Sequence, residues 1–225
     1  MKKGFSLVEL SIVLIIIGLL IAGVSSGSKL IKQARINSLI NELNELKNSF
    51  NIFEQIYDQL PGDINNAYDF FGSVDSCTNT SGGYNSCNGD GDYEIEWSYE
   101  SYRSNQHLAL AGLISGSYDG QTETISSSAF SSTIYHPALQ CSSMGHSDLG
   151  TVCIQLGGDN IGNNAGLIPV DQYRVDYKLD DGLPLSGNIR FRAIQDVSTT
   201  TCGDSSGYIL TSTSVGCNLL MTVDR

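Results

Sequence analysis

The apolar residues of this chain are concentrated near its N-terminus. From Leu10 to Val24 nearly every position is hydrophobic, and the segment counted from Phe5 to Val24 is 20 residues long. A helix of that length spans about 30 Å of hydrocarbon. One carboxylate, Glu9, interrupts the segment, and a charge at the middle of a bilayer costs on the order of 2–3 kcal/mol. The pattern therefore predicts a membrane helix in which Glu9 needs a partner.

A second apolar pattern follows directly beyond this span. Hydrophobic residues recur there at alternating intervals of three and four, at Ile36, Leu39, Leu43, Leu46, Phe50, Phe53, Tyr57 and Leu60. The opposite face is polar and carries Asn41, Glu45, Asn48 and Gln55. Such spacing is typical of an amphipathic helix, and Pro61-Gly62 ends it. We expect one continuous helix from Phe5 to Gln59 that packs on a sheet of the same chain rather than in a coiled coil.

Shorter elements follow from residue 61 onward. Two short helices are expected, one from Asp63 as N-cap to Gly72 as C-cap and one over residues 104–114. Strand-like runs occupy residues 133–139, 151–156, 172–179, 188–194 and 207–213. A turn at 178–187 is expected between two of these strands. A long helix followed by successive short strands is typical of the α+β class, so we expect the helix to pack on an antiparallel sheet.

Composition narrows the range of functions. The 225 residues suffice for one domain with a core, and a hydrophobic share of 40% argues against disorder. Acidic side chains outnumber basic ones by 24 to 12, which gives a net charge of −12. Phosphate binding needs a basic surface, so nucleic acid is not an expected partner.

Six cysteines in a loop-rich, acidic domain indicate disulfides and an oxidising compartment. They permit fifteen connectivities. We favour sequential pairing, which closes short loops between Cys77 and Cys87, Cys141 and Cys153, and Cys202 and Cys217. A zinc site is the disfavoured alternative, because its two cysteines are too far apart in sequence for the usual spacing. Its ligands would be His136, Cys141, His146 and Cys153.

An acidic segment begins at Asn88 and alternates oxygen-bearing side chains with glycine. Its candidate ligands for calcium are Asn88, Asp90, Asp92 and Glu94. The order resembles the start of a calcium loop, although Tyr93 stands where an EF-hand has its turn glycine. No Lys or Arg lies between Lys47 and Arg103, whereas ten acids do. Calcium is one expectation and a solvated acidic turn is the other; no other cofactor is required. Asp180-Asp181-Gly182 is a weaker candidate that a turn explains.

A hydrolase motif also occurs, because residues 203–207 fit the pattern G-x-S-x-G. A nucleophile elbow needs a strand before the serine and a helix after it. A strand-like run follows here, so we interpret the match as chance.

The chain opens with Lys2-Lys3-Gly4, then Phe5-Ser6-Leu7-Val8-Glu9 and the apolar run. This order resembles the type IV pilin signal, the prepilin cleavage and methylation motif. The resemblance implies that a prepilin peptidase cuts after Gly4 and methylates the new amine of Phe5. It also implies that Glu9 acts in assembly by pairing with the Phe5 amine of a neighbouring subunit. Many pilins have a proline near the end of the span, but residues 20–30 contain none.

The resemblance implies four segments. They are a leader (1–4), a transmembrane and assembly helix (5–28), its amphipathic continuation (29–60) and an exported globular pilin domain (61–225). The precursor is then expected in the bacterial inner membrane as a single-pass protein with its C-terminal domain outside the cytoplasm, and later in a periplasmic or cell-surface filament.

Two functions follow. The first is a structural, non-enzymatic subunit, a minor pilin or large pseudopilin, of a type IV pilus or type II secretion-like filament. Its partners would be other pilin subunits, the prepilin peptidase and the inner membrane. The alternative is a membrane-tethered exported binding protein or hydrolase. Glu9 favours the first, because a simple tether has no need of a carboxylate within the membrane.

Overall fold

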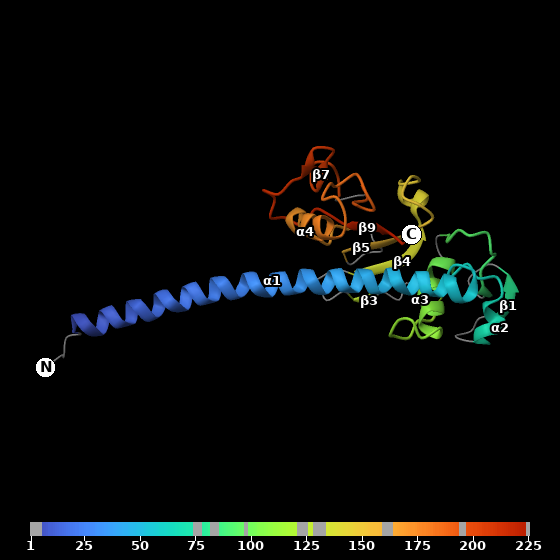
Figure 1. Cartoon of the computed structure of the whole chain (residues 1–225), viewed down its shortest axis with the longest axis horizontal. Helices are drawn as coiled ribbons and strands as arrows, with labels where there is room; N and C mark the ends of the chain where they lie inside the picture. Colours follow the sequence, from blue (N-terminus) through green and yellow to red (C-terminus); the bar gives the residue numbers. More distant parts are fainter. Residues whose placement is uncertain are drawn as a thin grey trace.

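One long helix, α1 (Leu7–Tyr57), dominates the computed structural model, which describes residues 6–73, 78–81, 86–96, 99–120, 126–127, 134–158, 164–193 and 197–223. Its 51 residues make it about 76 Å long. The first half of α1 extends away from the rest of the molecule, and the second half lies along the globular part (Figure 1). The helix ends at Asp58, whose left-handed backbone (φ 57°) directs its N–H to the Glu54 carbonyl. The predicted continuous helix is confirmed.

The main sheet has five antiparallel strands in the order β3-β4-β5-β9-β6, which confirms the predicted sheet. These strands are β3 (Ser126–Ser127), β4 (Ile134–Gln140), β5 (Val152–Gly157), β9 (Leu219–Thr222) and β6 (Ile189–Arg190). Two small strand pairs lie outside it, β1 (Thr78–Ser81) with β2 (Ser86–Asn88) and β7 (Gly203–Asp204) with β8 (Gly207–Tyr208). The other helices are α2 (Ala67–Phe71), α3 (Tyr99–Leu110), η1 (Cys141–Met144) and α4 (Pro169–Leu179).

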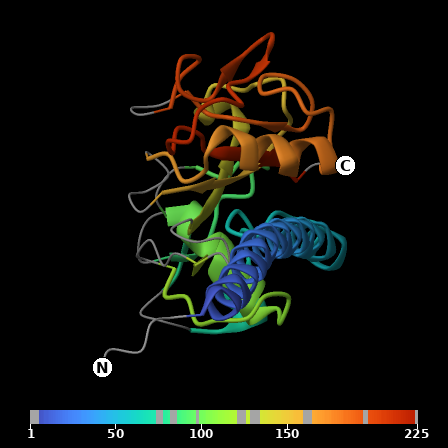
Figure 2. The same ribbon diagram turned by 90° about the vertical axis from the view of Figure 1, so that its left-hand side faces the viewer.

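The apolar stripe of α1 forms one core with the sheet. Its members Ile36, Leu39 and Phe53 are fully buried and belong to the same cluster as Ile154 of β5 and Leu219 of β9. Each such side chain contributes about 1.5–3 kcal/mol by leaving water. Figure 2 views α1 nearly end-on, with the sheet and α4 lying to one side of it. The prediction that α1 packs within its own chain is therefore confirmed.

One predicted strand is a helix. Residues 172–179 lie in α4, which begins with Pro169 at its first position. The run alternates aromatic and β-branched residues as a strand would, but its buried residues are Gln172, Val175 and Asp176. Those intervals of three and one belong to a helix face, and proline is well suited to a helix start. The turn at 178–187 consequently joins α4 to β6 rather than two strands.

The predicted boundaries of several other helices and strands were also wrong. The second short helix, α3, starts five residues before the predicted 104–114 and ends at Leu110. Only two residues of each of the runs 188–194 and 207–213 pair as strands, in β6 and β8. The strand β9, which lies between β5 and β6, was missed altogether. The first short helix, α2, ends at Gly72 as predicted but begins at Ala67, so Asp63 is not its N-cap.

Candidate functional site

The first turn of α1 engages Glu9. Ser6 is the N-cap: its Oγ accepts a hydrogen bond from the Val8 N–H at 3.3 Å, and its own N–H donates to Glu9 Oε2 at 2.8 Å. The sequence S-x-x-E at residues 6–9 is typical of such a capping box, although it was not predicted. Among the described residues Glu9 Oε1 has no such donor, so it is free to accept another. Gly4 and Phe5, the predicted processing residues, lie outside the described residues.

The apolar segment of α1 has no partner within the described part of the chain. Its large hydrophobic side chains are exposed from Leu7 to Ile31, by between 46% at Ile17 and 87% at Leu7. An 18-residue window of this helix has a mean hydropathy of 2.8 and is 0% buried. The helix is therefore long and apolar enough to cross a membrane. This is one candidate span, identified by length and composition.

The prokaryotic N-terminal methylation motif matches residues 1–25 of the chain. This chain carries the type IV pilin-type signal. The match includes Gly4, Phe5, Glu9 and most of the exposed apolar segment. No curated protein and no solved structure matches the chain. The pilin-type signal, together with the α+β layout, therefore carries the functional assignment.

Two of the predicted disulfides are present. Cys141 is bonded to Cys153 and Cys202 to Cys217, and all four residues are fully buried. The first bond removes both cysteines of the disfavoured zinc alternative, while the side chain of His136 is outside the described part. Cys87 is also disulfide-bonded, whereas Cys77 lies outside the described residues. No described cysteine is free.

The side chain of Asp63 holds the backbone of the predicted calcium segment. It is fully buried, and its carboxylate accepts hydrogen bonds from the N–H groups of Gly91 at 2.6 Å and Tyr93 at 2.8 Å. Burial raises the pKa of Asp63 to about 6, and the nearby Asp90 and Asp92 act in the same direction. Asp63 thus holds the loop in place, which replaces the predicted role as a helix cap.

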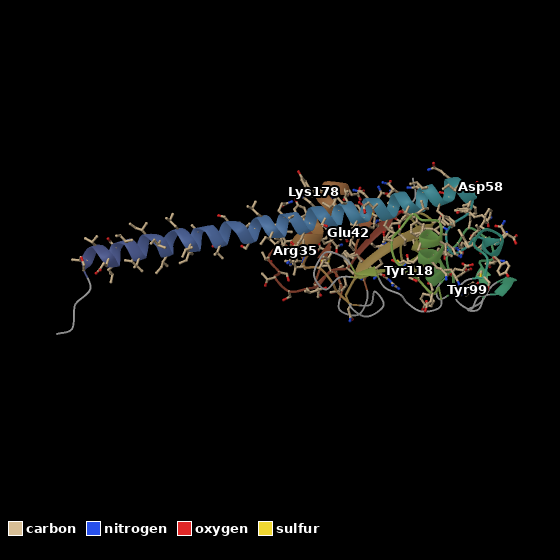
Figure 3. The ribbon with its side chains drawn as sticks, turned by 90° about the horizontal axis from the view of Figure 1, so that it is seen from below. Arg35, Glu42, Asp58, Tyr99, Tyr118 and Lys178 are labelled. Atoms are coloured by element: carbon tan, nitrogen blue, oxygen red, sulfur yellow. A yellow bond between two sulfur atoms is a disulfide. The ribbon has the colours of Figure 1, made fainter. Side chains whose placement is uncertain are left out.

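Glu100 holds the other side of this loop. It is fully buried in the first turn of α3, and its two oxygens accept from the N–H groups of Asp90 and Glu96, each at 3.1 Å. Burial, followed by a side-chain hydrogen bond with Glu96, raises the pKa of Glu100 to about 9. The loop lies at the end of the molecule far from the apolar segment, where Figure 3 labels Asp58 and Tyr99.

Several carboxylates converge in this loop, which we call the acidic loop (residues 88–96 with Asp63 and Glu100). Three groups have ligand oxygens within 4.8 Å of one another: Asp63, Asp90 and Asp92; Asp90, Glu96 and Glu100; and Asp92, Glu94 and Glu96. Of the predicted calcium ligands, Asp90 and Asp92 share the first of these groups, whereas Glu94 shares the third with Asp92. The Oδ1 of Asn88 accepts a hydrogen bond from the Tyr68 N–H at 2.8 Å, and calcium binding by Asn88 stays a prediction. The spacing within residues 88–96 gave no sign of Asp63, which lies in the turn before α2, or of Glu100, which lies in α3.

These carboxylates could hold a cation, but many already bind backbone N–H groups. Asp90 Oδ1 accepts from the Asp92 N–H, and Asp92 Oδ1 accepts from the Glu94 N–H. Such bonds are those of a self-stabilised turn. Calcium at the acidic loop stays a prediction. At the weaker candidate, Asp181 accepts from the Leu183 N–H at 2.8 Å and the Ser186 hydroxyl at 2.6 Å, as a turn residue does.

His107 joins the acidic end of the molecule to α1. Its Nδ1 accepts from the Gly62 N–H at 2.9 Å, so Nε2 carries the proton and donates to the Cys87 carbonyl at 3.0 Å. Burial lowers the pKa of His107 to about 3, which keeps the ring neutral. Gly62 has a φ of 102°, and a Cβ there would lie 2.4 Å from the Glu100 carbonyl oxygen. His107 therefore ties α3 to the turn that follows α1 and to β2, and its ring stacks on Phe53 of α1.

The G-x-S-x-G match lies in a hairpin. Gly203–Asp204 and Gly207–Tyr208 form the antiparallel strands β7 and β8, with the exposed Ser205 in the turn. A strand rather than a helix follows this serine, which is the opposite of a nucleophile elbow. The hairpin agrees with the interpretation of this match as chance.

Proposed function

We propose that this protein is a structural subunit, a minor pilin or large pseudopilin, of a type IV pilus or type II secretion-like filament. The match to the methylation motif supports the coarser statement, a type IV pilin-like or pseudopilin-like subunit. The observation that carries the proposal is the unpartnered half of α1, which bears that signal and no covering element in the described residues.

In this account the apolar segment lies first in the inner membrane and later in the interior of a filament. Exposed apolar surface is stabilised by about 25 cal/mol per Å² when it leaves water, so the precursor is held in the inner membrane. In a filament the same surface is buried against other subunits. The disulfide-bonded part lies outside the cytoplasm, because disulfides persist in oxidising compartments.

Glu9 sets the register between subunits in this account. One oxygen stays with the Ser6 N–H, and the other accepts from the Phe5 amine that cleavage after Gly4 creates on a neighbour. Desolvation offsets much of the attraction within such a buried pair, so the pair selects one arrangement more than it adds stability. The implied partners are other pilin subunits and the prepilin peptidase. No catalytic role is proposed.

The signal is tested by determining the mature N-terminus in a cell that contains prepilin peptidase. We expect intact-mass and N-terminal peptide analysis to find a chain that begins at Phe5 with a methylated amine. The same analysis in a cell without the peptidase is the control and should find the leader still attached. A mature start near Ser25 or Ser28 would mean an ordinary secretory signal and would contradict the proposal.

A further inference from the structure

The second half of α1 carries a regular row of amide side chains. In residues 33–55 every Asn and Gln lies at one of seven positions with successive intervals of 4, 4, 3, 4, 3 and 4. We call these residues the amide stripe: Gln33, Asn37, Asn41, Asn44, Asn48, Asn51 and Gln55. Such intervals place all seven on one face of a helix, roughly opposite the buried apolar stripe.

Most of this face is uncovered in the subunit. Six of the seven side chains are exposed, and Asn51 is half-buried. At the end nearer the apolar segment, Asn37 Oδ1 accepts from Gln33 Nε2 at 3.2 Å and from Lys178 Nζ at 2.6 Å. Within the described part of the chain, no such bond reaches the side chains of Asn41, Asn44 or Asn48. The packing of this subunit therefore does not explain why these positions are amides.

A helix face that remains in water would be expected to include charged residues. The same stretch of α1 also has charged residues, and all of them lie off the stripe: Arg35, Glu42, Glu45, Lys47 and Glu54. Asparagine is a poorer helix former than Glu, Lys or Arg, so the stripe weakens an isolated helix. An amide, however, can be buried when another amide satisfies it, whereas an unpaired charge cannot without a large cost. The amides thus suit a face that leaves water.

The stripe is also continuous with the unpartnered apolar segment. The same intervals of three and four continue toward the N-terminus through Leu30, Ser26, Gly23 and Leu19. One face therefore runs from the apolar segment into the globular part, first apolar and then amide, without a charge. We propose that the amide stripe is the contact surface for α1 of a second copy of this chain, packed in parallel.

The stripe would fix the position of two helices along their common axis. Apolar contacts permit parallel helices to slide, but amides buried opposite one another are satisfied only in particular registers, as a buried asparagine is in a coiled coil. This inference rests on the proposed filament function, since copies must lie side by side for the stripe to act. Glu9 would set register at one end of α1 and the amide stripe over the other half.

The test places two charges on the stripe of the full-length protein in an assembly-competent bacterium. Asn44→Glu with Asn48→Glu is expected to lower the ratio of sheared-filament to membrane-fraction protein by at least about tenfold. Cleavage after Gly4 should be unchanged, and the thermal midpoint should stay close to that of the wild type, because the higher helix propensity of Glu offsets the repulsion between two carboxylates at i and i+4. The matched control, Ser205→Glu with Ser214→Glu, adds the same charge at exposed loop positions and should assemble normally.

Asn44→Lys with Asn48→Lys should be equally defective, since burial penalises either sign of charge. Normal assembly of the Lys pair would indicate repulsion by this acidic protein instead and would overturn the inference. Normal assembly of the Glu pair would also overturn it, and if Glu9→Val failed to assemble in the same cells the filament function would still stand. Absence of the wild-type protein from filaments would overturn both.

Discussion

Glu100 is a fully buried carboxylate whose protonation should govern stability at high pH. Its pKa is raised by burial, so the folded protein binds a proton more tightly there than the unfolded chain does. Stability contributed by such a group is present at low pH and is lost as pH rises toward about 9. Asp63 and Asp176, with pKa values raised by burial to about 6 and about 7, act in the same direction at lower pH.

His107 acts in the opposite direction. Its pKa is lowered to about 3, so the unfolded chain binds the proton more tightly, and stability from this residue falls as pH drops below about 6.5. In mildly acidic solution, the buried carboxylates favour stability at lower pH and His107 favours stability at higher pH, so the two effects oppose each other. Above pH 7 the histidine no longer titrates in either state, and the carboxylates alone decide the trend.

The effect of these carboxylates on stability, and calcium binding at the acidic loop, can both be tested by thermal unfolding. In a chelator, we expect the thermal midpoint of the detergent-solubilised protein to fall between pH 7 and pH 9. If calcium binds only the folded state, calcium at 100 times its dissociation constant adds about 2.7 kcal/mol and raises the midpoint by several degrees. Asp90→Ala with Asp92→Ala should remove that rise, whereas Asp69→Ala, outside the loop, should keep it. A midpoint indifferent to millimolar calcium would leave the loop as a solvated turn.

At the scale of elements, α1 was the most predictable part. Eight apolar positions at intervals of three and four outweigh any local ambiguity, and the helix ends within two residues of the expected end. The disulfides were predictable for a related reason, since pairing neighbouring cysteines closes short loops. Both features depend on residues close together in the sequence.

Elements that depend on distant residues were less predictable. The strand β9 pairs with β5 and β6 and is buried on both faces, so it shows no alternation. Helix α4 was mistaken for a strand because Tyr173, Val175 and Tyr177 alternate, although its packing on α1 follows a helix face. The acidic loop was predicted only in part. The spacing of residues 88–96 is visible in the sequence, whereas Asp63 lies before this segment and Glu100 after it, and the fold brings them to it.

The disulfides themselves can be checked on the denatured protein. We expect no cysteine to react with a thiol reagent before reduction and all six to react after it. The reason is that no described cysteine is free and that Cys87 is bonded. Alkylation after reduction is the positive control. Two or more reactive cysteines in the unreduced chain would contradict three disulfides.

At the scale of the whole molecule, charge is divided between two ends. Near the apolar segment, Lys32 pairs with the buried Asp171 at 3.0 Å, and Figure 3 labels Arg35 and Lys178 in the same region. The acidic loop lies at the opposite end. Acidic charge without a neighbouring Lys or Arg in the sequence is therefore concentrated at the end away from the apolar segment.

Assembly through Glu9 is the central claim, and incorporation of a Glu9 variant tests it most directly. Glu9→Val and Glu9→Gln should be inserted, cleaved after Gly4 and folded, because valine enters a bilayer more readily than glutamate. The ratio of sheared-filament to membrane-fraction protein should nevertheless fall by at least about tenfold, since the neighbour's Phe5 amine loses its partner. Glu45→Gln, which removes an exposed carboxylate from the same helix, should assemble normally. Wild-type incorporation of Glu9→Val would contradict the account.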